Sequence, residues 1–169
     1  LAHMLPYVSL VDDRTVRTRV NELFQCIRLD GVNSYTTDDA YLDKVTALFA
    51  RIIAQLGPEF SYYVHKVSKA ITPDLEPVRE DSFAGEVDRL WRKKLETSGL
   101  RDKTLTLTVI HRPPPKSVLP FLNRSAPDRL KEATEKRLRR LGEAVSVFVS
   151  GLTELNPRVL SAKSGELIG

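Results

Sequence analysis

The sequence predicts an α/β fold of the α+β type: a two-layer sandwich of a mixed β-sheet with helices packed mainly on one face. Strand-like and helix-like segments follow one another in the order β, β, β, α, β, α, β, α. Most strand-like segments alternate apolar and polar residues, which indicates a sheet with one face that this chain's helices do not cover. A chain of 169 residues has the length of one domain that folds without disulfide or metal staples.

Three short strands are predicted near the N-terminus, at residues 7–11, 15–18 and 23–29. Asp12-Asp13-Arg14 supplies the turn between the first two strands, and Asn21-Glu22 supplies the turn before the third. The third strand ends at Asp30-Gly31, because this pair favours a turn.

The clearest helix follows, because apolar side chains recur at the i, i+3, i+4 and i+7 spacing of an amphipathic helix over residues 41–56. Thr36 or Thr37 is the expected N-cap, since a hydroxyl at this position accepts a hydrogen bond from a free backbone amide. Gly57-Pro58 then ends the helix.

Two more strands and two more helices are predicted, in the order strand 60–67, helix 83–97, strand 104–111 and helix 126–155. The triple proline at 113–115 ends the strand before it, because proline cannot donate to a sheet ladder. Ser125 is the expected cap of the last helix. Gly142 and Gly151 weaken that helix and mark a bend or an earlier end.

The strand at 104–111 predicts a polar sheet surface. Its leucines and Val109 are expected to face the helices, which leaves Thr104, Thr106 and Thr108 on the opposite face. Two interpretations remain open for these threonines, a solvated polar face and a face that a partner covers. An exposed edge strand could also accept a strand from a partner.

Charge is distributed unevenly along the chain, which has a formal net charge of +4. Residues 1–85 contain 9 basic and 12 acidic residues, whereas residues 86–169 contain 17 and 10. The basic residues cluster on two predicted helices, at Arg89, Arg92, Lys93 and Lys94, and at Arg129, Lys131, Lys136, Arg137, Arg139 and Arg140. These clusters are either solvated helix faces or a binding patch for an anionic surface.

No catalytic, metal-binding or cofactor-binding motif is present in the sequence. None of the eight glycines belongs to a phosphate loop or a dinucleotide-binding motif. Cys26, the single cysteine, lies within a strand and is expected to be a small buried side chain. His65 and His111 lack metal-ligand spacing. The paired acidic residues occur at turns and helix starts, where capping favours them.

Several segments occur in the order and spacing of a known family. They are Leu5-Pro6-Tyr7-Val8, Val11-Asp12-Asp13-Arg14-Thr15, Leu23-Phe24-Gln25-Cys26-Ile27-Arg28-Leu29-Asp30-Gly31, Val109-Ile110-His111-Arg112-Pro113 and Asn156-Pro157-Arg158-Val159-Leu160. Together they resemble the N-terminal domain of the large VirB/CagE/TrbE-type ATPases of bacterial type IV secretion systems, which serve conjugation and effector translocation. The triple proline departs from the family pattern.

The resemblance implies a domain organisation. Residues 1–4 are expected to be a vector scar, residues 5–160 the N-terminal interaction domain, and residues 161–169 the start of a linker toward an ATPase domain absent from this chain. ATP and magnesium would bind in that missing domain only. The fragment is therefore expected to be non-enzymatic and to have no cofactor of its own.

The resemblance also implies a role at the cytoplasmic face of the bacterial inner membrane, to which the protein would be peripheral. The expected partners are small inner-membrane subunits of the secretion channel, other copies of the ATPase and an anionic membrane surface. The expected interaction surface consists of Thr104, Thr106, Thr108, Arg89, Arg92, Lys93, Lys136, Arg139 and Arg140. The alternative is a basic nucleic-acid-binding module, disfavoured because no aromatic residues are interleaved with the basic ones.

Overall fold

The computed structural model describes residues 7–32, 37–71, 83–97, 99, 101–114 and 127–164. The chain divides into two compact units. The sheet unit contains residues Leu1–His65 and Leu105–Gly169, and the α2 unit contains residues Lys66–Thr104. Strands β4 and β5 have residues in both units.

The sheet has six strands: β1 (Tyr7–Leu10), β2 (Val16–Thr18), β3 (Leu23–Leu29), β4 (Phe60–Ala70), β5 (Arg101–His111) and β6 (Arg158–Val159). Their order is β1-β2-β3-β5-β4, and β6 pairs with β3. β3 pairs with β5 in antiparallel register along its whole length. The other edge of β3 is shared, because β2 pairs antiparallel with its first residues and β6 with Ile27 and Arg28.

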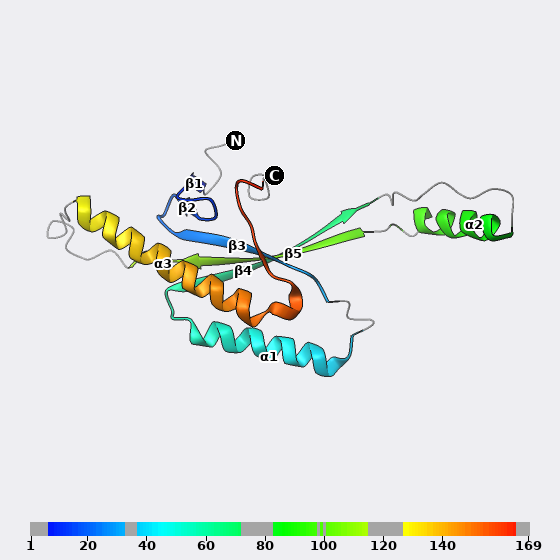
Figure 1. Ribbon diagram of the computed structural model, residues 1–169, viewed down its shortest axis with the longest axis horizontal. Coiled ribbons are helices and arrows are strands. Elements are labelled where there is room, and N and C mark those ends of the chain that lie inside the picture. Colours follow the sequence, from blue (N-terminus) through cyan, green and yellow to red (C-terminus); the bar gives the residue numbers. More distant parts are fainter. Residues whose placement is uncertain are drawn as a thin grey trace. The chain divides into compact units, whose positions relative to one another are not determined.

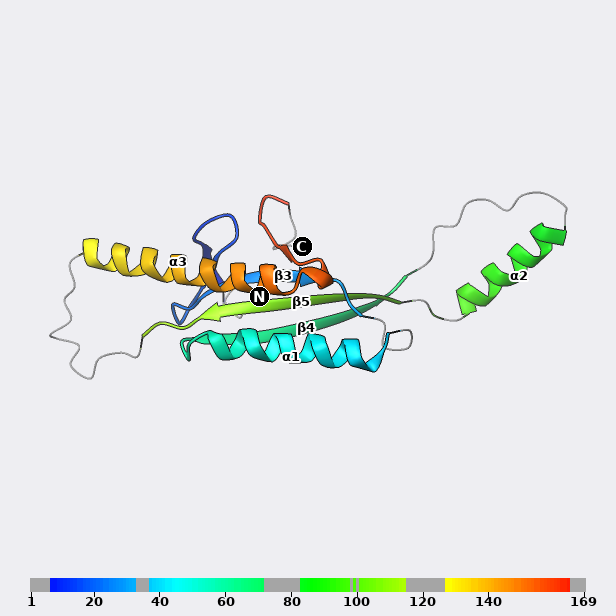
Figure 2. The ribbon, with the colours of Figure 1, turned by 60° about the horizontal axis from the view of Figure 1, so that its bottom comes forward.

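Helices α1 (Asp39–Gln55) and α3 (Pro127–Gly151) contact each other and pack on the sheet through one core (Figure 1). Phe148 of α3 lies at the centre of this core, with its ring 5.6 Å from that of Phe49 and 5.5 Å from that of Tyr62. Figure 2 shows the two helices from a second side, along the strands that they cover. The predicted two-layer α+β sandwich is confirmed.

Several boundaries differ from the prediction. The N-cap of α1 is Asp38, whose carboxylate accepts a hydrogen bond from the Ala40 amide, so Thr37 does not have this role, and Thr36 lies outside the described residues. β4 and β5 are longer than expected, reaching Ala70 and beginning at Arg101. Ser125, the expected cap of α3, lies outside the described residues.

The last helix is shorter than the range 126–155, and its end falls at one of the two glycines that were expected to mark a bend or an earlier end. α3 ends at Gly151, and a separate 3-10 turn occupies Thr153–Leu155 before Asn156 adopts a left-handed conformation with φ of 45°. The short strand β6 that follows was not predicted, because two residues carry no periodic pattern. Main-chain hydrogen bonds place it, including Leu160 N to Cys26 O at 2.8 Å.

The residues after β6 fold back onto the turn between β1 and β2. Ser161 Oγ donates to Asp13 Oδ2 at 2.7 Å, and the Ala162 amide donates to the Asp13 carbonyl at 2.8 Å. The Asp13 side chain also accepts from the Lys163 amide at 3.1 Å. These contacts join the two ends of the described sheet unit, so residues 161–164 are part of its structure.

Candidate interaction surfaces

A basic pocket opens in the sheet unit where β5 ends and β4 begins. Its volume is about 730 Å³. Its lining residues are Pro58, Glu59, His111, Arg112, Pro113, Pro114, Ala133, Lys136, Arg137 and Arg140. We call this cavity the basic pocket because it contains four cationic side chains and a single carboxylate.

Two walls form the basic pocket. On one side, the Arg112 amide donates to the Glu59 carbonyl at 2.8 Å, which ties the segment after β5 to the turn before β4. On the other side, α3 presents Ala133, Lys136, Arg137 and Arg140, whose i, i+3, i+4 and i+7 spacing places them on one face of the helix.

Arg137 and His111 connect the two walls. The Nη2 atom of Arg137 donates to the Asn21 carbonyl at 2.7 Å and to the His111 carbonyl at 3.3 Å, while its Nε donates to His111 Nδ1 at 3.4 Å. His111 is only 7% exposed and packs edge-on against Phe60. Burial, followed by the Arg137 charge, lowers the pKa of His111 below 6.5.

Arg140 and Glu59 form the ion pair of the basic pocket. Arg140 Nη2 lies 3.1 Å from Glu59 Oε1, and its Nη1 lies 3.4 Å from Glu143 Oε2. A hydrogen bond to its own backbone, and then Arg140, lower the pKa of the Glu59 carboxyl. Glu59 is therefore ionised at neutral pH and balances Arg140.

Arg112 and Lys136 have exposed side chains at the basic pocket and no acidic partner within the part of the chain that the structure describes. The pocket therefore has an excess of positive charge, since one carboxylate faces four cations. Such an arrangement attracts anions.

A second surface lies on α2 (Phe83–Thr97), in the α2 unit. Phe83, Val87, Leu90 and Trp91 recur at helical spacing, and all four are exposed, Phe83 by 85% and Trp91 by 51%. We call these four residues the α2 apolar face. Large apolar side chains gathered on one exposed helix face are typical of interaction sites.

The predicted basic residues of α2 lie beside this face. Arg92 pairs with Asp88 at 2.9 Å, one turn earlier on the helix. Arg89 and Lys93 are exposed. The predicted apolar stripe of this helix is thus present, but within the described part of the chain its large side chains are not covered.

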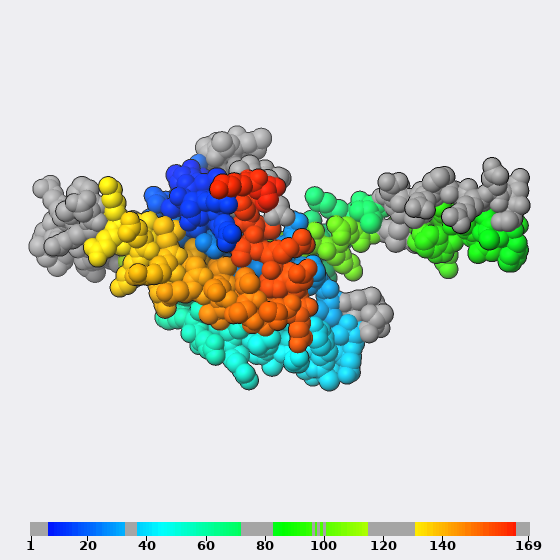
Figure 3. Space-filling model, in the orientation of Figure 1, coloured from blue at the N-terminus to red at the C-terminus, as the bar shows by residue number. Residues whose placement is uncertain are grey.

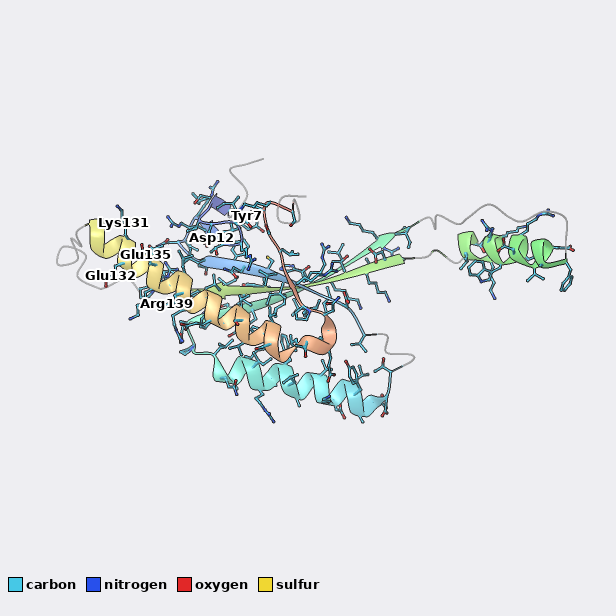
Figure 4. All side chains as sticks on the ribbon, viewed as in Figure 1. Tyr7, Asp12, Lys131, Glu132, Glu135 and Arg139 are labelled. Carbon is cyan, nitrogen blue, oxygen red and sulfur yellow. The ribbon has the colours of Figure 1, made fainter. Side chains whose placement is uncertain are left out.

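The predicted surface residues do not form one patch. Lys136 and Arg140 both line the basic pocket. Arg139 is exposed and does not line it. Figure 4 labels Arg139 and Lys131 on α3. Arg89, Arg92 and Lys93 belong to the α2 unit. Arg137 belongs to the predicted basic cluster of the last helix but not to the predicted interaction surface, and neither Arg112 nor His111 was predicted to bind a partner.

The threonines of β5 do not form a row of fully solvent-exposed side chains. Thr108 is 8% exposed and its hydroxyl lies 3.5 Å from the Cys26 sulfur, so the expectation of an uncovered position is wrong there. Thr104 and Thr106 are half-buried. The physical reason is local, because Thr108 lies opposite Cys26 and next to the pair formed by Phe24 and Ile110, which are themselves buried on this face.

The described residues contain neither a metal-binding cluster nor a membrane-spanning helix. Among these residues, no group of three or more histidine, cysteine, aspartate or glutamate side chains could hold a metal ion. Within the same residues, no helix has the length and apolar character needed to cross a membrane.

Comparison with known protein families gives a match. The family model described as "Type IV secretion system ATPase VirB4/TrbE, N-terminal domain" matches residues 14–118. The matched segment contains α2 and the β5 wall of the basic pocket, while the α3 wall lies beyond it. No curated protein matches the chain significantly.

Proposed function

Because the chain belongs to the VirB4/TrbE family of type IV secretion system ATPases, as an N-terminal domain, we propose that it is a non-catalytic docking domain. It contacts small inner-membrane subunits of the secretion channel and neighbouring copies of the ATPase, at the cytoplasmic face of the inner membrane. ATP and magnesium bind in the separate ATPase domain of the parent protein and have no site here.

The α2 apolar face is the observation that supports this proposal most directly. Burial of apolar surface is favourable by about 25 cal/mol per Å². Covering the four large exposed side chains of this face would therefore contribute a favourable free energy of association. The occupant that fits is an apolar segment of an inner-membrane subunit where it emerges from the bilayer. Such a segment offers apolar side chains close to the anionic headgroups that attract basic residues.

The basic residues of α2 are consistent with a contact close to the anionic headgroups of the membrane. Arg89 and Lys93 are exposed on the same helix as the apolar face. Close to an anionic leaflet, each such side chain adds about 1 kcal/mol of attraction. We therefore place α2 against the subunit at the level of the headgroups.

Co-purification with the inner-membrane subunits tests the proposal. The full-length ATPase carrying Leu90→Gln or Trp91→Ala should retain the subunits at least about tenfold less well than the wild type, since each change removes apolar contact area. Val20→Gln is the matched control, because Val20 is an equally exposed apolar residue of the sheet unit.

The results distinguish a protein partner of the α2 apolar face from a lipid surface. Equal retention of the subunits by all three variants would refute docking through α2. Loss of binding to anionic vesicles with unchanged binding of the subunits would assign α2 to the lipid surface and overturn the proposed protein contact.

A further inference from the structure

We propose that the basic pocket of the sheet unit binds a phosphate group carried by a small molecule or a lipid headgroup. Arg112, Lys136, Arg137 and Arg140 supply the positive charge, and the pocket lies between the segment after β5 and one face of α3. This proposal does not depend on docking through α2, because the pocket is built from the sheet unit alone.

The charge balance of the pocket is the first argument. Glu59 balances Arg140 through their 3.1 Å contact, which leaves three cationic side chains at the pocket without a carboxylate within its lining. A phosphate group carries up to two negative charges and three acceptor oxygens, so it can satisfy several donors at once. A single carboxylate offers fewer acceptors for the same donors.

The environment of Arg137 is the second argument. Its hydrogen-bond acceptors among the described residues are two backbone carbonyls and a neutral imidazole nitrogen, none of which carries a negative charge. The guanidinium is half-buried, and the charges near it oppose each other, because Arg17 repels it and Glu22 attracts it. A half-buried charge that has no hydrogen-bonded counter-ion among the described residues is costly. A bound anion would offset this cost, while the carbonyls keep the guanidinium fork oriented in advance.

The shape of the pocket selects the kind of ligand. The cations line one concave site of about 730 Å³ and do not form a track along the surface. Its other lining residues are Pro58, Glu59, His111, Pro113, Pro114 and Ala133. The one ring among them, His111, is only 7% exposed and packs against Phe60, which leaves little ring surface on which a base could stack. A compact phosphate group therefore fits better than a nucleic-acid strand, which would require an extended path.

Isothermal titration calorimetry of the 169-residue chain tests the proposal, with inorganic phosphate and pyrophosphate as probes at constant ionic strength. We expect saturable binding at one site, with pyrophosphate tighter than phosphate because it carries more charge. Absence of saturable binding of both probes would overturn the proposal, unless the vesicle experiment below detects the headgroup form.

Two variants and a control locate the site. Lys136→Ala and Arg112→Ala should each weaken binding at least about fivefold, because each removes one charged donor. Lys131→Ala is the matched control, since Lys131 is an exposed lysine of the same helix outside the pocket (Figure 4). Equal weakening by Lys131→Ala would indicate general attraction to a basic surface and contradict a built site. Both Lys136 and Arg112 are exposed, so circular dichroism should show unchanged folding.

A flotation experiment distinguishes the source of the phosphate. Vesicles of phosphatidylcholine with and without phosphatidic acid are compared, using the wild type and Lys136→Ala. Binding that requires both phosphatidic acid and Lys136 assigns the pocket to a lipid headgroup, whereas calorimetric binding alone assigns it to a soluble phosphate. Lys136-dependent binding of an oligonucleotide or a glutamate-rich peptide, with neither phosphate form bound, would overturn the proposal.

Discussion

At the scale of single residues, His111 shows how a buried polar side chain connects strand, helix and pocket. Its ring packs edge-on against Phe60 at 5.1 Å between centroids, and its Nδ1 accepts a hydrogen bond from Arg137. The neighbouring Glu59 charge acts in the opposite direction, and burial is the largest influence on the imidazole. The net effect favours neutral His111 in the folded chain.

This environment predicts a pH dependence of stability. The pKa of His111 is lowered in the folded state, so the unfolded chain binds more protons as the pH falls below 6.5. The free energy of unfolding should therefore decrease as the pH falls below the ordinary histidine pKa of about 6.5, and the His111 contribution should level off below its folded-state pKa. In His111→Gln this part of the decrease should be absent, as measured by urea unfolding in phosphate-free buffer.

The control for this experiment is His65→Gln, because His65 is an exposed histidine of β4. It should keep the pH dependence of the wild type. An unchanged slope in His111→Gln would show that the carboxylates alone determine the pH dependence, contrary to the assignment.

At the scale of elements, α1 and α3 approach each other closely at the end of α3. A Cβ atom added at Gly151 would lie 2.6 Å from Ile52 Cδ1, which is closer than van der Waals contact allows. Glycine therefore lets the two helices approach at the end of α3. Figure 3 shows the surface of α1, in cyan, in contact with the orange C-terminal part of α3.

A double-mutant cycle tests this contact. Gly151→Ala alone should destabilise the chain by about 1 kcal/mol, because the buried Ile52 side chain must move. In the Ile52→Val background, which removes the clashing Cδ1 atom, the same change should cost less or stabilise the chain. The measurement is the free energy of unfolding from denaturant titration.

Gly142→Ala provides the matched control, because a Cβ atom added there meets nothing within 4 Å. It should stabilise α3 by up to about 1 kcal/mol through helix propensity alone. An equal effect of Gly151→Ala in both backgrounds would show that Gly151 does not act through Ile52.

At the scale of the whole molecule, the chain is the N-terminal domain of a VirB4/TrbE-type ATPase, and its two surfaces belong to different units. The sheet unit holds the basic pocket, and the α2 unit holds the exposed apolar face. A docking role and a phosphate site can therefore be examined by separate substitutions, one in each unit.

The whole-molecule prediction concerns catalysis. The 169-residue chain should hydrolyse ATP no faster than a buffer blank, because its sequence contains no phosphate loop with the lysine that such hydrolysis needs. An ADP-release assay measures this, with the full-length ATPase as the positive control. ATP hydrolysis that persists after repurification of the chain would contradict the proposal that this domain is non-catalytic.

Much of the fold could be predicted from local patterns. Residues 23–29 and 83–97 were assigned with the boundaries that the structure has, because strand alternation and helix periodicity are properties of neighbouring residues. The same reasoning missed β6, since its two residues become a strand only through hydrogen bonds to the distant Ile27 and Arg28. It also assigned the wrong cap to α1, where Thr37 and Asp38 are both good capping residues.

The candidate site was less predictable. The spacing of Lys136 and Arg140 on α3 was visible in the sequence, and the excess of basic residues in the second half pointed to an anionic partner. Arg137 was predicted only as a member of a basic cluster, either a solvated face or a binding patch, but the structure directs its charged end to Asn21 and His111. A signal was available, because Arg137 shares its helix face with Arg140, yet nothing local indicated what this face meets.

The sequence by itself determined the order of the elements, the amphipathic face of each helix and the family to which the chain belongs. Only the tertiary structure decided that α3 faces the end of β5, that Thr108 is buried and that the α2 apolar face is exposed within the described residues. The physical reason is that periodicity reports which side chains of one element share a face. What covers that face depends on contacts between residues far apart in the chain, and no local pattern encodes those contacts.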